Sequence, residues 1–137
     1  MGYTARRVEY FHTTVSGVPG EAYEVLSHLA NLGVNFLALT SVPLGPESVQ
    51  LTLFPEDPLQ LQNAAKNARL ALNGPHPAVL VQGIDELGAL AGVHRVLREN
   101  GIEAYASSGA TDGHGYFGYI LYLRAEDAAK AARALSS

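Results

Sequence analysis

The sequence predicts an α+β fold built from two βαββα repeats, in which antiparallel sheets carry their helices on one face. The chain aligns with itself at an offset of 68 residues, which places Gly20 on Gly88 without a gap. Apolar residues switch between strand-like and helix-like spacing in the same order in both halves, and glycine or proline separates the segments. These observations divide the chain into two repeats, residues 1–75 and 76–137.

In the first repeat, residues 8–15 are rich in β-branched and aromatic side chains, which predicts a strand. Residues 21–32 then place apolar side chains on one helical face, and Gly33 supplies the left-handed residue that commonly ends a helix. Two strands follow at 34–42 and 48–54, separated by a turn rich in proline and glycine.

A second helix of this repeat is expected to begin after Asp57, which caps it, and to continue to residue 72. Pro58 suits its first turn, where a missing N–H costs nothing. The second repeat has the same order of elements, expected at strand 78–83, helix 86–100, strands 102–108 and 116–123, and helix 126–135.

The segment 111–120 contains glycines at the GxGxxG spacing, namely Gly113, Gly115 and Gly118. A phosphate-binding loop of this kind follows a strand and opens a helix, because the phosphates rest on the helix N-terminus. Here a strand follows instead, and Gly113 aligns with Gly45 in the turn of the first repeat. We therefore predict a hairpin turn rather than a nucleotide site.

Composition narrows the function further. Nine Lys and Arg residues face thirteen Asp and Glu residues, so the net charge is −4 and no basic surface for nucleic acid is expected. The chain has no cysteine, which excludes disulfides and Cys-type metal sites. No stretch has signal-peptide or membrane-span character, so we expect a cytoplasmic protein with no membrane partner and no cofactor.

The βαββα order is ferredoxin-like, lacking only a last strand. Residues 16–36, "SGVPGEAYEVLSHLANLGVNF", resemble the start of an ACT domain, in which a strand leads into a Pro-Gly loop, a helix and a "GVN" entry to the second strand. Residues 81–103, "VQGIDELGALAGVHRVLRENGIE", look like the same motif. The resemblance covers nearly the whole chain as a tandem pair.

The resemblance implies a non-catalytic regulatory protein that binds an amino acid or similar metabolite and forms a homodimer. The implied ligand-binding residues lie in the two loops after the first strand of each repeat and at the next strand entry: Gly17, Val18, Pro19, Gly20, Asn35, Ile84, Asp85 and Gly88. Backbone N–H groups at a helix N-terminus favour a carboxylate, and Asp85 can receive an ammonium group. The simpler alternative is that Asp85 caps its helix and Pro19 and Gly20 only shape a turn.

The sequence departs from the ACT pattern in one respect. Only "NGPHP", residues 73–77, separates the first repeat from the strand of the second, which leaves no room for a private fourth strand. Either residues 78–83 serve both halves, or each sheet has an open edge that another strand covers.

Two other classes of function stay open. Five histidines are present, but none forms an HxxxH or HxxEH motif, so we expect no metal site. A small isomerase or lyase on the same frame would use a histidine such as His12 or His114 together with a carboxylate. A pure oligomerisation module would explain open sheet edges and strands rich in aromatic residues.

Overall fold

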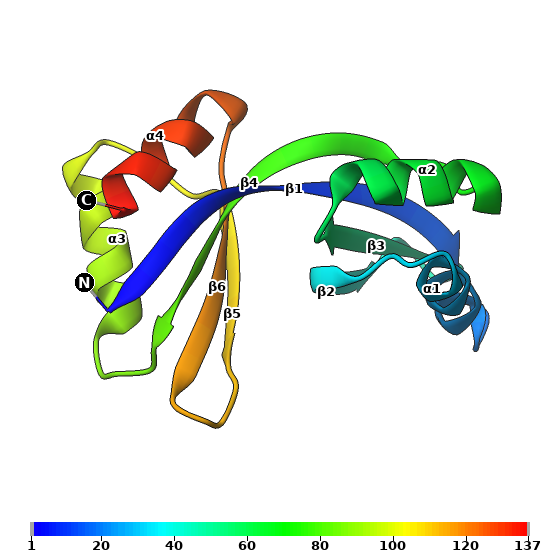
Figure 1. The fold of residues 1–137 in the computed structure, drawn as a ribbon, viewed down its shortest axis with the longest axis horizontal. Coiled ribbons are helices and arrows are strands. Elements are labelled where there is room, and N and C mark those ends of the chain that lie inside the picture. Colours follow the sequence, from blue (N-terminus) through cyan, green and yellow to red (C-terminus); the bar gives the residue numbers. More distant parts are fainter. Residues whose placement is uncertain (1, 137) are drawn as a thin grey trace. The chain divides into compact units, whose positions relative to one another are not determined.

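The computed structural model describes residues 2–136, in which the predicted order of strand, helix, two strands and helix occurs twice (Figure 1). The α+β, ferredoxin-like class is therefore confirmed. The elements are β1 (Tyr3–Ser16), α1 (Glu21–Asn31), β2 (Phe36–Pro43), β3 (Ser48–Pro55), α2 (Pro58–Ala68), β4 (Asn73–Ile84), α3 (Ala89–Glu99), β5 (Ala106–Thr111), β6 (Tyr116–Tyr122) and α4 (Ala125–Leu135).

The chain forms two compact units. The first unit comprises Glu9–His76, and the second comprises the chain up to Val8 and from Pro77 onward. This division differs from the halves 1–75 and 76–137 in two respects: the start of β1 lies in the second unit, and His76 lies in the first.

In the first unit, β3 lies between β2 and β1 and pairs antiparallel with both. Phe11 of β1 lies opposite Leu53 of β3, and both are buried beneath the helices. Leu29 of α1 and Leu61 of α2 contact the same cluster, so both helices cover one face of the strands. Burial of each such side chain stabilises the fold by about 1.5–3 kcal/mol.

The second unit repeats this arrangement with β6 between β4 and β5, again antiparallel. Val81 of β4 lies opposite Tyr119 of β6. Both join a core with Val93 of α3 and Leu135 of α4, so α3 and α4 cover one face of these strands (Figure 1).

The missing fourth strand of each unit comes from the strand that begins the other repeat. The backbone N–H of Ile84 donates to the carbonyl of Gly2 at 2.8 Å, beside the first residues of β1. In the first unit, a side chain at Gly74 would meet the Tyr10 carbonyl at 2.8 Å, so the start of β4 lies against β1. The strands β1 and β4 run antiparallel, because their contacts move in opposite directions along the two segments.

This arrangement corrects the expectation for residues 73–77. They are not a linker, since β4 begins at Asn73. Of the two alternatives, sharing by residues 78–83 is wrong, because these residues lie in the second unit alone; the earlier part of β4, residues 73–76, supplies the first unit. The chain needs no private fourth strand because β1 and β4 are long enough to serve both units.

Four predicted boundaries are also wrong. The first strand begins at Tyr3 rather than at residue 8. The second helix ends at Ala68 rather than residue 72, because Arg69 adopts a left-handed conformation with φ 55°. The third helix begins at Ala89 rather than near Glu86. The strand expected at 102–108 occupies 106–111 instead, since Ile102 is buried in the core before β5 begins.

The hairpin prediction for the glycine-rich segment is confirmed. Gly113 and Gly115 lie between β5 and β6 with φ values of 74° and 96°, which glycine tolerates and other residues rarely adopt. The Asp112 carboxylate accepts the backbone N–H of His114 at 2.6 Å and that of Tyr116 at 3.1 Å. No helix follows these glycines before α4, so they do not form a phosphate loop.

Candidate functional site

The strongest candidate site begins at the loop between β4 and α3. Gly88 occupies the N-cap position of α3 with φ 84°, and no side chain caps this helix. The alternative that Asp85 caps this helix is therefore wrong, because the helix begins four residues later. The Asp85 carboxylate is exposed and can interact with a ligand. The first-turn N–H groups of Leu90 and Ala91 have no capping side chain, so they can receive an anion.

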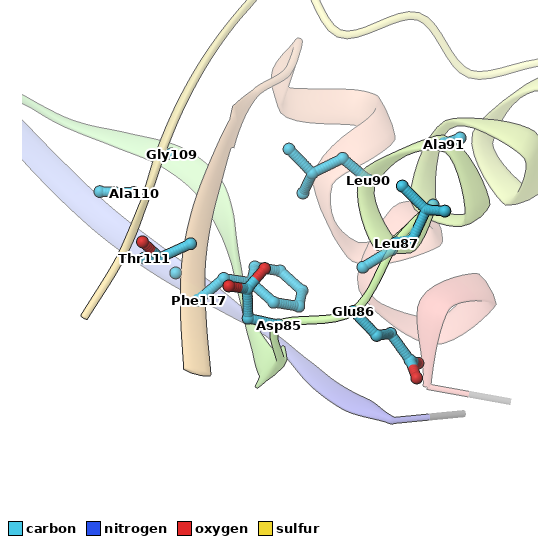
Figure 2. Close-up of a pocket in the computed structure, with 12 residues that line it drawn as sticks. Asp85, Glu86, Leu87, Leu90, Ala91, Gly109, Ala110, Thr111 and Phe117 are labelled. Carbon is cyan, nitrogen blue, oxygen red and sulfur yellow. The ribbon is translucent and has the colours of Figure 1, made fainter. Parts of the chain in front are cut away.

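A cavity of about 730 Å³ adjoins this helix end (Figure 2). One wall is the loop and first turn from Asp85 to Ala91, and the other comes from β5 and β6. The apolar part of the lining includes Leu87, Leu90 and Phe117. The polar part consists of the Asp85 and Glu86 carboxylates and the Thr111 hydroxyl. The cavity therefore has both apolar and charged groups in its lining.

The strand wall follows from the sheet register. Thr111 of β5 lies opposite Phe117 of β6, and Phe117 belongs to the core beneath the helices. Because successive side chains alternate between faces, Thr111 shares the helix-covered face and Ala110 has the opposite orientation. Figure 2 shows Leu90 extending from α3 toward these strands.

These groups suit a small zwitterion. The N-terminus of α3 carries partial positive charge, and the first turn of this helix has no acidic residue. A carboxylate is favoured at this end, while the Asp85 carboxylate in the same lining can accept an ammonium group. The apolar lining then accommodates a short aliphatic side chain.

The corresponding loop of the first unit has similar backbone geometry, but the helix that follows it begins with acidic residues. Gly20 is the N-cap of α1 with φ 93°, again without a capping side chain. The first turn of α1, however, holds Glu21 and Glu24, which repel an anion. The N–H of Gly17 donates to the Glu47 carbonyl at 2.9 Å, and that of Val18 donates to the Ser16 hydroxyl at 3.1 Å.

The eight predicted site residues thus separate between the units. Gly17, Val18, Pro19 and Gly20 form an exposed loop of the first unit. Asn35, directly before β2, is in the same unit and accepts the N–H of Glu56 through its backbone carbonyl at 2.9 Å. Asp85 and Gly88 line the cavity of the second unit, while Ile84 ends β4 next to Gly2.

Sequence reasoning missed the strand wall of the cavity. Residues 109–111 and Phe117 belong to a hairpin distant in sequence from the loop. The repeat register placed this hairpin correctly but did not indicate which of its residues face the start of α3. Gly118, a glycine inside a strand, was the one available signal, because such positions often mark a close approach or a ligand.

Comparison with known proteins identifies solved structures with a similar fold. No protein-family model matches the sequence, and no curated protein matches it. Among solved structures, protein BT0572 from Bacteroides thetaiotaomicron is 21% identical with a TM-score of 0.79, covering 96% of this chain and 88% of that one. The regulatory subunit of aspartate kinase from Thermus thermophilus, in its ligand-free form, is 17% identical with a TM-score of 0.67, covering 98% and 95%.

The chain has an ACT-like fold. Escherichia coli aspartokinase III, in a complex with lysine and aspartate, contains a similar region, at 20% identity and a TM-score of 0.55. That match covers 97% of the ACT-like chain and 31% of the enzyme.

Two further observations concern the part of the ACT-like chain that the structure describes. None of the helices within residues 2–136 combines the length and apolar character needed to cross a bilayer. Within the same residues, no group of three or more His, Asp or Glu side chains is arranged to hold a metal ion.

Proposed function

We propose that this chain is a non-catalytic regulatory protein that binds an amino acid, or a metabolite with the same charged groups, in the cavity at the start of α3. The observation that carries the proposal is the uncapped N-terminus of α3 next to the Asp85 carboxylate and an apolar wall. A ligand that bridges the helix start and the β5–β6 hairpin would stabilise both elements together. This ordering would be the signal passed to a partner.

The similar structures support the proposal without identifying the ligand. One is the regulatory subunit of an aspartate kinase, and another is an aspartokinase in a complex with lysine and aspartate. For the present chain, the lining favours a ligand with one carboxylate, one ammonium group and a compact apolar side chain.

A thermal-shift screen over the amino acids tests the proposal. A ligand present at about 100 times its dissociation constant stabilises the folded state by roughly 2.7 kcal/mol, which raises the melting temperature by several degrees. Asp85→Asn should abolish the shift, because it removes the partner of the ammonium group. Glu21→Gln is the matched control, since it removes a carboxylate from the equivalent helix start in the first unit.

A second pair of variants tests the place of binding. Thr111→Phe should fill the cavity and abolish ligand binding, whereas Ala106→Phe lies on the same strand outside the cavity lining and should retain binding. If Glu21→Gln loses the ligand-induced shift and Asp85→Asn retains it, the binding site lies in the first unit instead. An absence of any shift across the panel would contradict ligand sensing.

We also propose that the protein acts as a homodimer. The strand β5 forms an edge of the sheet, and all six of its residues are exposed, from Ala106 to Thr111. An exposed edge presents unpaired backbone groups that another strand can cover. Light scattering should show a dimer, and Ser108→Lys on this edge should weaken it; a monomeric unaltered protein would contradict this.

A further inference from the structure

Two histidines distant in sequence come together on the first unit. His12 lies in β1 and His76 lies in β4, with ring centres 5.5 Å apart. Phe11, the neighbour of His12, is buried beneath the helices. His12 therefore lies on the opposite face of the strands, away from α1 and α2.

Each ring has one nitrogen held by an oxygen. Nδ1 of His12 lies 2.9 Å from the hydroxyl oxygen of Thr52, the residue opposite it on β3. Nε2 of His76 lies 2.5 Å from Oδ1 of Asn73, and because an amide oxygen only accepts, this nitrogen carries the proton. The lone pair of His76 is therefore on Nδ1. In the tautomer of His12 that donates from Nδ1 to the Thr52 hydroxyl, the lone pair of His12 is on Nε2.

Aromatic side chains support the pair. The Tyr10 ring centre is 5.2 Å from that of His12 and 5.3 Å from that of His76. Tyr10 is only 4% exposed and packs in turn against the buried Phe54. This packing restricts the rotamers of both imidazoles, so the arrangement is held in place before anything binds.

We propose that His12 and His76 together bind a divalent transition metal ion of the Zn²⁺, Ni²⁺ or Cu²⁺ class through Nε2 and Nδ1. Metal–nitrogen distances of about 2.0–2.1 Å place two imidazole centres about 5 Å apart on a tetrahedral ion, which matches the observed separation. Thr52 and Asn73 hold the other ring nitrogens, as oxygen groups commonly do behind histidine ligands. With no cluster of three ligating side chains in residues 2–136, water or a small ligand completes the coordination.

Isothermal titration of the tag-free protein with Zn²⁺ at about pH 7.5 tests the proposal. We expect one ion per chain in the unaltered protein and at least tenfold weaker binding in both His12→Ala and His76→Ala. His28→Ala is the matched control, because His28 is an exposed histidine on α1 of the same unit and should leave binding unchanged. Absence of Zn²⁺ binding, or binding that survives both substitutions, would overturn the proposal.

A third variant keeps both histidines. Thr52→Val preserves the shape of a residue that is 5% exposed but removes the oxygen behind His12, and should weaken Zn²⁺ binding about 10- to 100-fold. Circular dichroism verifies that each variant is folded. If a histidine variant fails to fold, the Cu²⁺ electron paramagnetic resonance spectrum of the unaltered protein decides: two imidazole nitrogens support the pair, and one or none refutes it.

Discussion

The Nε2 nitrogen of His94 on α3 lies 2.7 Å from the phenol oxygen of Tyr119 on β6, and the same phenol donates to the Ser107 hydroxyl at 2.9 Å. One buried tyrosine thus joins a helix, a central strand and an edge strand of the second unit. Its ring is part of the core beneath α3 and α4. The hydrogen bonds therefore tie the helix that begins at the cavity to the hairpin that forms the opposite wall.

Replacing this phenol should weaken the second unit. Tyr119→Phe removes both hydrogen bonds and leaves the ring in place, so we expect a loss of about 0.5–1.5 kcal/mol per bond in the free energy of unfolding. Urea unfolding measures the change. Tyr116→Phe is the control, because Tyr116 is 58% exposed and should change stability little. Equal effects of the two substitutions would contradict the role of the Tyr119 hydroxyl.

The two aspartates at helix starts should behave differently. Asp57 accepts the N–H groups of Leu59 and Gln60 at 3.1 and 3.2 Å, so Asp57→Ala should cost about 1 kcal/mol. Asp85 caps no helix, and Asp85→Ala should leave stability nearly unchanged while removing ligand binding. Chemical unfolding of both variants makes the comparison. A destabilisation by Asp85→Ala as large as that by Asp57→Ala would restore the capping role.

Substitutions of two glycines, one inside α3 and one at its N-cap, should change the free energy of unfolding in opposite directions. At Gly92, inside the helix, an added Cβ meets nothing within 4 Å, so Gly92→Ala should stabilise the protein by about 0.5–1 kcal/mol through helix propensity. At Gly88 the space is equally open but φ is 84°, so Gly88→Ala should destabilise by about 1 kcal/mol. Thermal unfolding distinguishes them. The same sign for both would show that the left-handed N-cap is not required.

The stability of the first unit should fall in mild acid. The pKa of His12 is lowered in the folded protein, by burial and then by His76, so the unfolded chain binds the proton more readily. This histidine has no effect on stability well above its unfolded pKa of about 6.5. As the pH falls below that value the free energy of unfolding decreases, until the folded pKa is passed.

Melting curves between about pH 7.5 and pH 5.5 measure this dependence. In His12→Gln the decrease should be smaller than in the unaltered protein. His28→Gln, which removes an exposed histidine of the same unit, serves as the control. If the melting temperature of the unaltered protein rises on acidification through this range and that of His12→Gln does not, the lowered pKa of His12 is contradicted.

Local features of the structure could be predicted because neighbouring residues decide them. Asp57 and Pro58 mark the start of α2, and Gly33, with φ 85°, follows the end of α1. Gly113 lies in a hairpin turn because a strand, and not a helix, follows it. Caps and turns depend on a few consecutive dihedral angles and hydrogen bonds, so a short stretch of sequence contains the necessary information.

The candidate site was predictable only in part. The loop with Asp85 and Gly88 follows from the repeat and the ACT resemblance, yet its N-cap geometry required coordinates, since Asp85 also fits the pattern of a cap. The wall from Phe117 and Thr111 depends on how a distant hairpin packs against α3. The pair of His12 and His76 has no sequence motif, because their proximity arises from strands that meet across a long separation along the chain.

The sequence by itself therefore determined the type, order and approximate ends of the helices and strands. Tertiary structure decided that β1 and β4 each serve both units, which residues of the β5–β6 hairpin face the start of α3, and that His12 meets His76. The physical reason is the range of the interactions. A helix end is set by hydrogen bonds within one turn, whereas a strand partner is chosen by the burial of apolar surface from segments far apart in the chain.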